Sequence, residues 1–230
     1  MEFDIDNYHL KSLSLLDLVS PKEATLLKSR MVRREFLKGA FLFRENSYSK
    51  GIYVVRKGKV KIFQTGEDGK RSIVYFYRKG DFFGHRPILA KEPHPVSAMA
   101  MDQVVVSFIP MQTFLSVLDA SDTLARQLLV NLSKEFSVWI NKMTLFTRYN
   151  LKKRVALSLL ILCRVYQRAG SDKATISITR DDFASYVGTA KETLVRMLRQ
   201  FKDEEIIVAN GTNITITDMK ALQKIVYSAS

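Results

Sequence analysis

Residues 178–217 read ITRDDFASYVGTAKETLVRMLRQFKDEEIIVANGTNITIT, and this stretch decides the architecture of the C-terminal part of the chain. Thr179 and Asp182 have the Ser/Thr-x-x-acid spacing that marks a helix start. The helical pattern continues only to Gly188, and glycine is the residue that most readily ends a helix. The pattern therefore predicts a short helix that Gly188 terminates.

A second helix start follows at once. Thr189 and Glu192 repeat the spacing and predict a capping box, and the helix is then expected to run to about Asp203. Two helices joined by a tight turn that contains glycine form a helix-turn-helix unit. The next residues, IIVANGTNITIT, predict a β-hairpin that turns at Asn210 and Gly211, which is the wing that often flanks such a unit.

The second helix is predicted to have two unlike faces. At about 100° per residue, one face falls within an arc of roughly 100°. That arc holds Glu192, Val195, Arg196 and Arg199, and the opposite side holds Leu194, Met197, Leu198 and Phe201. From a helix in the major groove, an arginine donates two hydrogen bonds to guanine O6 and N7, and a glutamate accepts one from cytosine N4. The alternative is a polar face that is only solvated.

Composition narrows the class of partner. A formal net charge of +13 over 230 residues suits nucleic acid, a phosphorylated ligand or an acidic membrane surface. No apolar run reaches the roughly 18 to 20 residues of a membrane span, and no signal or transit peptide is recognisable. We therefore expect a cytoplasmic protein that does not enter a membrane. The single cysteine, Cys163, excludes an internal disulfide and an iron–sulfur cluster.

Upstream, residues 35–110 read as short strands that glycines separate: EFLKGAFLF, GIYVVRKGKVKIFQ, RSIVYFYRKGDFF and QVVVSFIP. The segment TGEDGK at 65–70 predicts the tip of a hairpin. Strands at this spacing favour an antiparallel barrel or sandwich. Ahead of them, Ser20, Pro21 and Glu23 predict the capped start of a helix.

After Pro110 the hydrophobic period changes from two to about three and a half. The apolar positions are Leu124, Leu128, Leu132, Phe136, Ile140 and Met143. They predict one helix of roughly 25 to 28 residues, which either lies along the β domain, pairs with its own copy, or does both. We expect three regions: 1–118 with the strands, 119–148 with the long helix and 149–230 with the helix-turn-helix.

The stretch ITRDDFASYVGTAKETLVRMLRQFKDEEII resembles the DNA-binding element of the CRP/FNR family of bacterial transcription regulators. In that family a T-R-x-x-x-A/G-x-x-x-G start leads into an R/K-E-T-x-x-R recognition helix. GIYVVRKGKVKIF and RKGDFFG are similar to its β-roll strands. The resemblance implies an α+β protein with an antiparallel, jelly-roll-like β-roll sensor domain, a long dimerisation helix and a C-terminal winged helix-turn-helix.

The resemblance implies that three residues of the second helix read bases: Lys191, Glu192 and Arg196. Thr189, Val195, Arg199 and Arg180 complete the expected DNA-binding set. Val195 departs from the serine that one branch of the family carries, which leaves the half-site sequence open. Arg196 is the first candidate, because Glu192 is also the residue that would close the capping box.

Relatives that bind cyclic AMP carry G-E-L-A/G-L followed by R-S/T-A, where the glutamate binds the ribose and the arginine the phosphate. The aligned words here are GHRPIL and PVSA, so His85 replaces the glutamate and Val96 the arginine. The possible effector pocket comprises Gly84, His85, Arg86, Val96 and Ser97. We do not expect cyclic AMP in the usual pose, since valine cannot pair with a phosphate. The alternative is that Arg86, which follows His85, supplies the positive charge that Val96 lacks.

His85 and His94 raise the question of a metal or haem site, because imidazole binds both. The H-x-H pair of a metal-binding barrel is missing, so we interpret both residues as surface or turn histidines and expect neither a metal nor a cofactor. No catalytic set is recognisable by spacing, so we expect no enzyme.

We therefore expect a homodimeric, sequence-specific regulator that binds an inverted repeat in double-stranded DNA, works without an effector or with an unknown small molecule, and contacts RNA polymerase. A cyclic-nucleotide- or haem-sensing regulator is one alternative. A β-roll signalling module that no longer binds DNA is the other.

Overall fold

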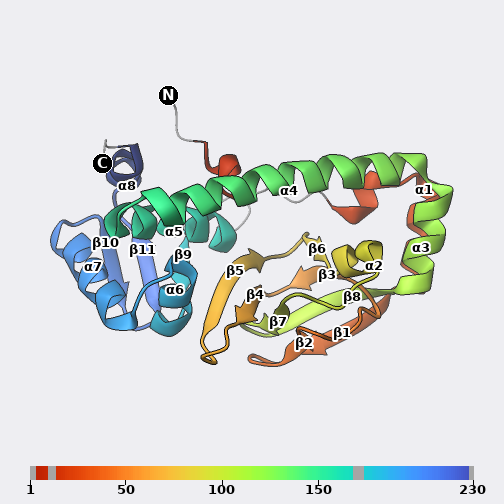
Figure 1. The fold of residues 1–230 in the computed structure, drawn as a ribbon, viewed down its shortest axis with the longest axis horizontal. Coiled ribbons are helices and arrows are strands. Elements are labelled where there is room, and N and C mark those ends of the chain that lie inside the picture. Colours follow the sequence, from red (N-terminus) through yellow and green to blue (C-terminus); the bar gives the residue numbers. More distant parts are fainter. Residues whose placement is uncertain (1–3, 10–13, 168–173, 228–230) are drawn as a thin grey trace. The chain divides into compact units, whose positions relative to one another are not determined.

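The computed structural model describes residues 4–9, 14–167 and 174–227 (Figure 1). These residues fall into two compact units, one within 11–134 and the other within 1–10 and 135–230. The division into regions 1–118, 119–148 and 149–230 stays a prediction.

The unit within 11–134 contains the predicted antiparallel strands. They form two four-stranded sheets, ordered β1-β8-β3-β6 and β2-β7-β4-β5, and every pairing is antiparallel. The strands are β1 Val32–Phe36, β2 Phe41–Phe43, β3 Gly51–Lys57, β4 Val60–Thr65, β5 Arg71–Tyr77, β6 Phe82–Phe83, β7 Ser97–Ala100 and β8 Val104–Pro110. The predicted hairpin tip at 65–70 connects β4 to β5 and is confirmed.

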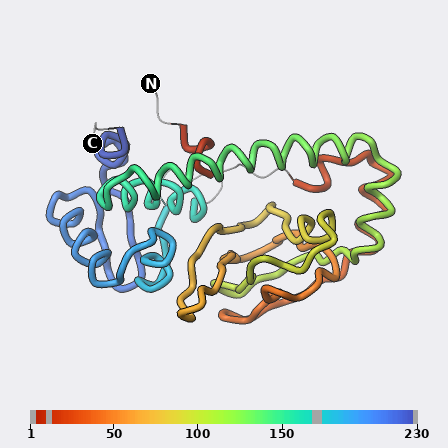
Figure 2. The backbone as a smooth tube through the Cα atoms, viewed as in Figure 1, coloured from red at the N-terminus to blue at the C-terminus, as the bar shows by residue number. Residues whose placement is uncertain are grey.

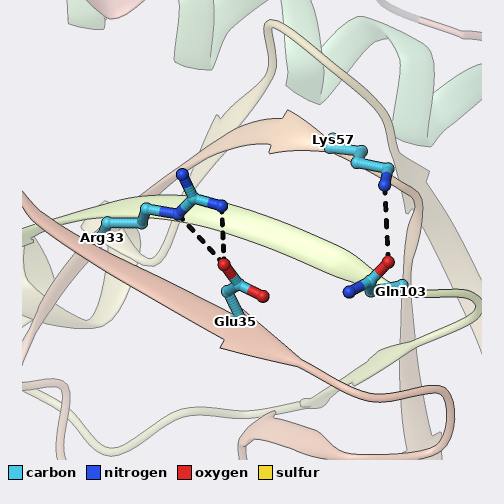
Figure 3. Close-up of polar contacts among 4 residues, drawn as sticks. All are labelled: Arg33, Glu35, Lys57 and Gln103. Atoms are coloured by element: carbon cyan, nitrogen blue, oxygen red, sulfur yellow. Dashed lines mark hydrogen bonds and ion pairs between the residues drawn. The ribbon is translucent and has the colours of Figure 1, made fainter.

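The two sheets share one hydrophobic core, because alternate side chains of each strand face inward. Val55 and Val106 come from one sheet and Val60 and Ala98 from the other, and all four are buried in the same cluster. The outward-facing ends of the strands carry ionic and polar pairs instead. Figure 3 shows Arg33 donating to Glu35 at 2.6 Å along β1, and Lys57 near Gln103.

Helices cover a second core in the same unit. They are η2 Leu15–Leu18, α1 Pro21–Arg30, α2 His85–Ala90 and α3 Met111–Ala120. The capping box predicted at the start of α1 is confirmed: Ser20 Oγ accepts from the Glu23 amide at 3.3 Å, and Glu23 Oε2 accepts from the Ser20 amide at 2.7 Å. The helix α2 was not predicted from the sequence.

The long helix is α4, Asp122–Arg148, and its 27 residues agree with the predicted length. One side of α4 is buried, including Leu124, Leu128, Val138 and Leu145. Tyr149 and Asn150 connect it to α5, Leu151–Tyr166, whose first turn Asn150 caps by accepting a hydrogen bond from the Lys153 amide at 3.0 Å.

The other unit is built on α5. Around it pack β9, α6, α7 and α8, and the three strands form an antiparallel sheet ordered β10-β11-β9 (Figure 2). The elements are η1 Ile5–Asn7, β9 Thr175–Ser177, α6 Arg180–Val187, α7 Lys191–Asp203, β10 Ile207–Asn210, β11 Asn213–Ile216 and α8 Met219–Tyr227. The predicted wing is the β10–β11 hairpin, with Gly211 at φ 55° in its turn.

Candidate nucleic-acid interface

The turn between α6 and α7 is fixed by its glycine. Gly188 has φ 71°, in the left-handed region that glycine adopts without strain, and ends α6 as predicted. Its amide donates to the Ala184 carbonyl at 2.9 Å, and the Thr189 amide donates to the same carbonyl at 3.1 Å. A Cβ at Gly188 would lie 3.2 Å from the Phe146 ring, so the turn also packs closely against α4.

The start of α7 differs from the prediction. The first helix is capped as expected, with Thr179 Oγ1 accepting from the Asp182 amide at 3.1 Å. The prediction that Thr189 caps α7 is wrong, because the N-cap residue is Ala190. Thr189 is still hydrogen-bonded to α6 through its amide, which moves the start of α7 one residue along the chain. Glu192 is therefore not held by a box with Thr189.

The two faces of α7 are arranged as predicted. Leu194, Leu198 and Phe201 are buried against the rest of the unit. On the other side lie four exposed residues: Glu192, Val195, Arg196 and Arg199. The structure thus brings the predicted base-reading arc together on one solvent-facing surface, which we call the α7 arc.

Two further residues of the predicted set have partners or burial that the sequence did not reveal. Lys191 donates to Asp181 Oδ2 at 3.0 Å, and both side chains are exposed. Arg180 is partly buried, burial lowers its pKa, and its Nη1 has no hydrogen-bond partner among the described residues. Asp181 was missed, although an acid beside the T-R motif was the signal that could have found it.

The possible effector pocket lies around the start of α2. Gly84 has φ 92°, and a Cβ there would lie 3.1 Å from the Gly51 carbonyl oxygen, so only glycine fits without a shift. Val96 is partly buried against the core, and Ser97 Oγ accepts a hydrogen bond from the Glu45 amide at 3.0 Å. Arg86 is exposed.

Neither His85 nor His94 is a surface residue, because both side chains are buried; His85 begins α2, and His94 lies in the segment between α2 and β7. His94 stacks on Phe43 with ring centroids 3.7 Å apart, and burial lowers its pKa to about 4. His85 is 1% exposed, and neither ring nitrogen has a hydrogen-bond partner among the described residues. Burial and then the nearby Arg86 charge lower its pKa to about 3.

Aromatic rings from both sheets pack together in the β-roll. Phe83 lies between Tyr53 and Tyr77, with centroid distances of 5.4 and 4.6 Å and nearly parallel planes. Tyr53 also donates to the Leu42 carbonyl at 3.1 Å, and burial raises the pKa of Tyr77 to about 12. The three rings of Tyr53, Phe83 and Tyr77 therefore pack against one another.

The chain is similar to known proteins in sequence and in fold. Residues 33–121 match the cyclic nucleotide-binding domain, and residues 153–225 match the Crp-like helix-turn-helix domain. The transcriptional activator protein Anr of Pseudomonas protegens is 29% identical over 218 residues, which cover 91% of this chain and 89% of Anr. The fumarate and nitrate reduction regulatory protein of Escherichia coli is 27% identical and covers 84% of this chain and 78% of its own.

The fold has solved counterparts. The structure of FixK2 from Bradyrhizobium japonicum superposes with a TM-score of 0.77 at 23% identity, covering 87% of this chain and 99% of FixK2. Among the helices of the described residues, none is long and apolar enough to cross a membrane. The two domain matches lie in the order of the β-roll and the winged helix, and the relatives are transcription regulators, not enzymes. This chain belongs to the CRP/FNR family of transcription regulators.

Proposed function

We propose that this DNA-binding regulator acts as a cytoplasmic homodimer that places two α7 helices in successive major grooves of an inverted repeat, about one helical turn apart. The observation that carries the proposal is the α7 arc, whose arginines are exposed while the opposite side of the same helix is buried. Lys191, Glu192 and Arg196 are the base readers, and Thr189, Val195, Arg199 and Arg180 complete the DNA-contacting set.

Dimerisation is supported by α4. Leu129, Phe136 and Met143 recur every seven residues along it, Ile140 lies between the last two, and all four side chains are exposed. We call these four residues the α4 stripe. Apolar residues that repeat every seven positions form the seam of a helix pair, so the stripe suits a second copy of the same helix. RNA polymerase is a further partner of the assembled dimer on DNA.

The β-roll is proposed to work without cyclic AMP. The residues aligned with the nucleotide's glutamate and arginine are a buried neutral imidazole at His85 and a valine at Val96. His85 does not replace the carboxylate that accepts from the ribose hydroxyl, and Val96 cannot pair with the phosphate. The rings of Tyr53 and Phe83 from one sheet and of Tyr77 from the other stack on one another. The protein is therefore effector-independent or responds to a different small molecule.

The central test uses Arg196→Ala. On a specific operator the variant should lose about 1 to 3 kcal/mol of binding free energy and lose its preference at one base pair of each half-site, since one bidentate contact is removed. Fluorescence anisotropy over a salt series measures both effects. Lys220→Ala is the matched control, because it removes one exposed positive charge from α8 of the same unit and should leave base preference unchanged.

The proposal fails if wild-type protein shows no site-selective binding to its own upstream DNA across the salt series. It also fails if Arg196→Ala and Lys220→Ala weaken binding equally on every sequence, because that pattern belongs to unspecific charge.

A second measurement tests the effector domain. Operator affinity of the apoprotein should stay unchanged when cyclic AMP is added at saturating concentrations, because no arginine pairs with the phosphate at position 96. Cyclic GMP and haem are run in parallel, and binding is read by the same anisotropy assay. A large gain in affinity with cyclic AMP overturns the proposed reading of the pocket.

A further inference from the structure

The N-terminal residues belong to the same compact unit as the winged helix. Residues 4–9 contain the single turn η1, Ile5–Asn7, and its flanking residues; Asp4 Oδ1 accepts from the Asp6 amide at 2.9 Å, and the Ile5 carbonyl accepts from the amides of Tyr8 and His9. Figure 2 shows this red turn beside the C-terminal half of α4. We call residues 4–9 the N-terminal clasp.

The clasp contacts three different places on its unit. Asp6 Oδ1 forms an ion pair with Arg164 of α5 at 2.9 Å. The next residue, Asn7, accepts a hydrogen bond through its backbone carbonyl from Asn141 Nδ2 of α4 at 2.8 Å. Because these residues are consecutive, their partners on α4 and α5 lie on either side of one short turn.

The third contact is at the connection between the two helices. The hydroxyl groups of Tyr8 and Tyr149 are 3.3 Å apart. Burial, this hydrogen bond and the neighbouring phenols of Tyr149 and Tyr227 raise the pKa of Tyr8. His9, the next residue, is buried. The clasp is thus a packed part of the unit.

The connection between α4 and α5, which the clasp bridges, is short. Only Tyr149 and Asn150 separate α4 from α5, so a change in the backbone torsions of two residues would reorient α5. The helices α6 and α7 pack on α5, so they would move with it. Contacts on α4, on the connection and on α5 restrict that motion, because one short rigid turn cannot satisfy all three at a different angle.

From this geometry we infer that the N-terminal clasp positions the recognition helix by fixing the α4–α5 angle, with Asp6 and Tyr8 as positioning residues. The inference rests on the proposed dimeric DNA binding, in which α4 joins the two copies. A fixed angle at each connection sets the separation of the two α7 helices. The clasp therefore determines which half-site spacing the dimer prefers.

The test uses the full-length chain and two readouts. Asp6→Asn removes the ion pair, and Tyr8→Phe removes the hydroxyl contact. Asn7→Lys is the matched control, because it adds the same charge as Asp6→Asn one residue away and keeps the backbone carbonyl. The double variant Asp6→Arg with Arg164→Asp reverses the pair at constant net charge.

Hydrogen exchange reports on the connection without DNA. Three amides flank it: the Tyr149 amide donates to the Leu145 carbonyl at the end of α4, and the amides of Lys153 and Arg154 donate to oxygens of Asn150 in the first turn of α5. Their exchange should accelerate about two- to fivefold in Asp6→Asn and in Tyr8→Phe, the range expected for loss of one partly exposed contact. The control should match wild type, and the reversed pair should exchange more slowly than Asp6→Arg alone.

Operator binding reports on positioning. Against a series of operators that differ only in half-site spacing, Asp6→Asn and Tyr8→Phe should discriminate about two- to fivefold less than wild type, while Asn7→Lys keeps the wild-type preference. Unchanged hydrogen exchange in both variants overturns the clasp, and faster exchange with an intact spacing preference overturns its positioning role. If wild type itself binds no site selectively, the proposed function fails, whereas hydrogen exchange still decides whether the clasp holds the connection.

Discussion

At the scale of single residues, His85 shows how burial limits what a side chain does. The ring lies beside Phe82 at a centroid distance of 5.0 Å and is 1% exposed. An imidazole in such surroundings stays neutral, since a buried charge without a counterion costs several kcal/mol. His85 is therefore a neutral, buried side chain of the β-roll unit.

Acid should destabilise the β-roll through His85. Its pKa is about 3 in the folded chain and about 6.5 when unfolded, so below pH 6.5 the unfolded chain binds a proton that the folded chain does not. Stability is full above pH 6.5 and falls by up to about 1.4 kcal/mol per pH unit as the pH drops toward 3. His85→Phe should remove this contribution, as urea unfolding at pH 7, 6 and 5 will measure. Parallel loss of stability in variant and wild type would contradict the assignment.

At the scale of elements, α6 and α7 differ in how they begin. Thr179 caps α6 with its hydroxyl, whereas α7 begins after Ala190, which has no side-chain oxygen to accept from the first turn. The recognition helix therefore starts without the side-chain cap that would stabilise it by about 1 kcal/mol. A serine at the N-cap position supplies the missing acceptor.

Ala190→Ser should accordingly stabilise the winged-helix unit by about 0.5 to 2 kcal/mol, because its hydroxyl accepts from an amide of the first turn of α7. Thr189→Ala is the informative control and should change the free energy of unfolding little, since Thr189 acts through its backbone amide. Urea unfolding of both variants gives the comparison. If Thr189→Ala proves to be the destabilising one, then the threonine is the cap after all.

These helices also show which parts of the fold could be predicted from the sequence. The elements with strong local signals were predictable: α4 from its apolar period, the wing from Asn210 and Gly211, and the end of α6 from Gly188. The outward face of α7 followed from helical geometry alone. The start of α7 was placed one residue too early, because the Thr189 amide still belongs to the end of α6, where it donates to the Ala184 carbonyl, and the N-cap of α7 is Ala190.

The β-roll shows the opposite limit. The helix α2 spans only His85–Ala90, which is too short to display a helical period, and the burial of His94 depends on stacking against Phe43 from a distant strand. Neither feature has a local signal. The Asp6 to Arg164 contact could not be predicted for the same reason, since it joins residues that are far apart in the sequence.

At the scale of the whole molecule, α4 is the element that both units share, because the division between them falls within it. The α4 stripe occurs in both of its halves, from Leu129 to Met143. Side chains such as Phe136 and Met143, each 67% exposed, are unusual on a surface that meets only water, and a row of them marks an interaction face.

The dimer is best tested by placing a charge in that row. Phe136→Glu should give a folded monomer, because the side chain is exposed within one chain but would lie in the seam of the helix pair, where two unpaired carboxylates would meet. Lys134→Glu adds the same acidic group to α4 on the side away from the stripe and should remain a dimer. Sedimentation velocity gives the oligomeric state, and circular dichroism shows that both variants fold. Operator affinity should fall sharply for Phe136→Glu alone, since a monomer engages one half-site, and a dimeric Phe136→Glu would move the self-association surface off the stripe.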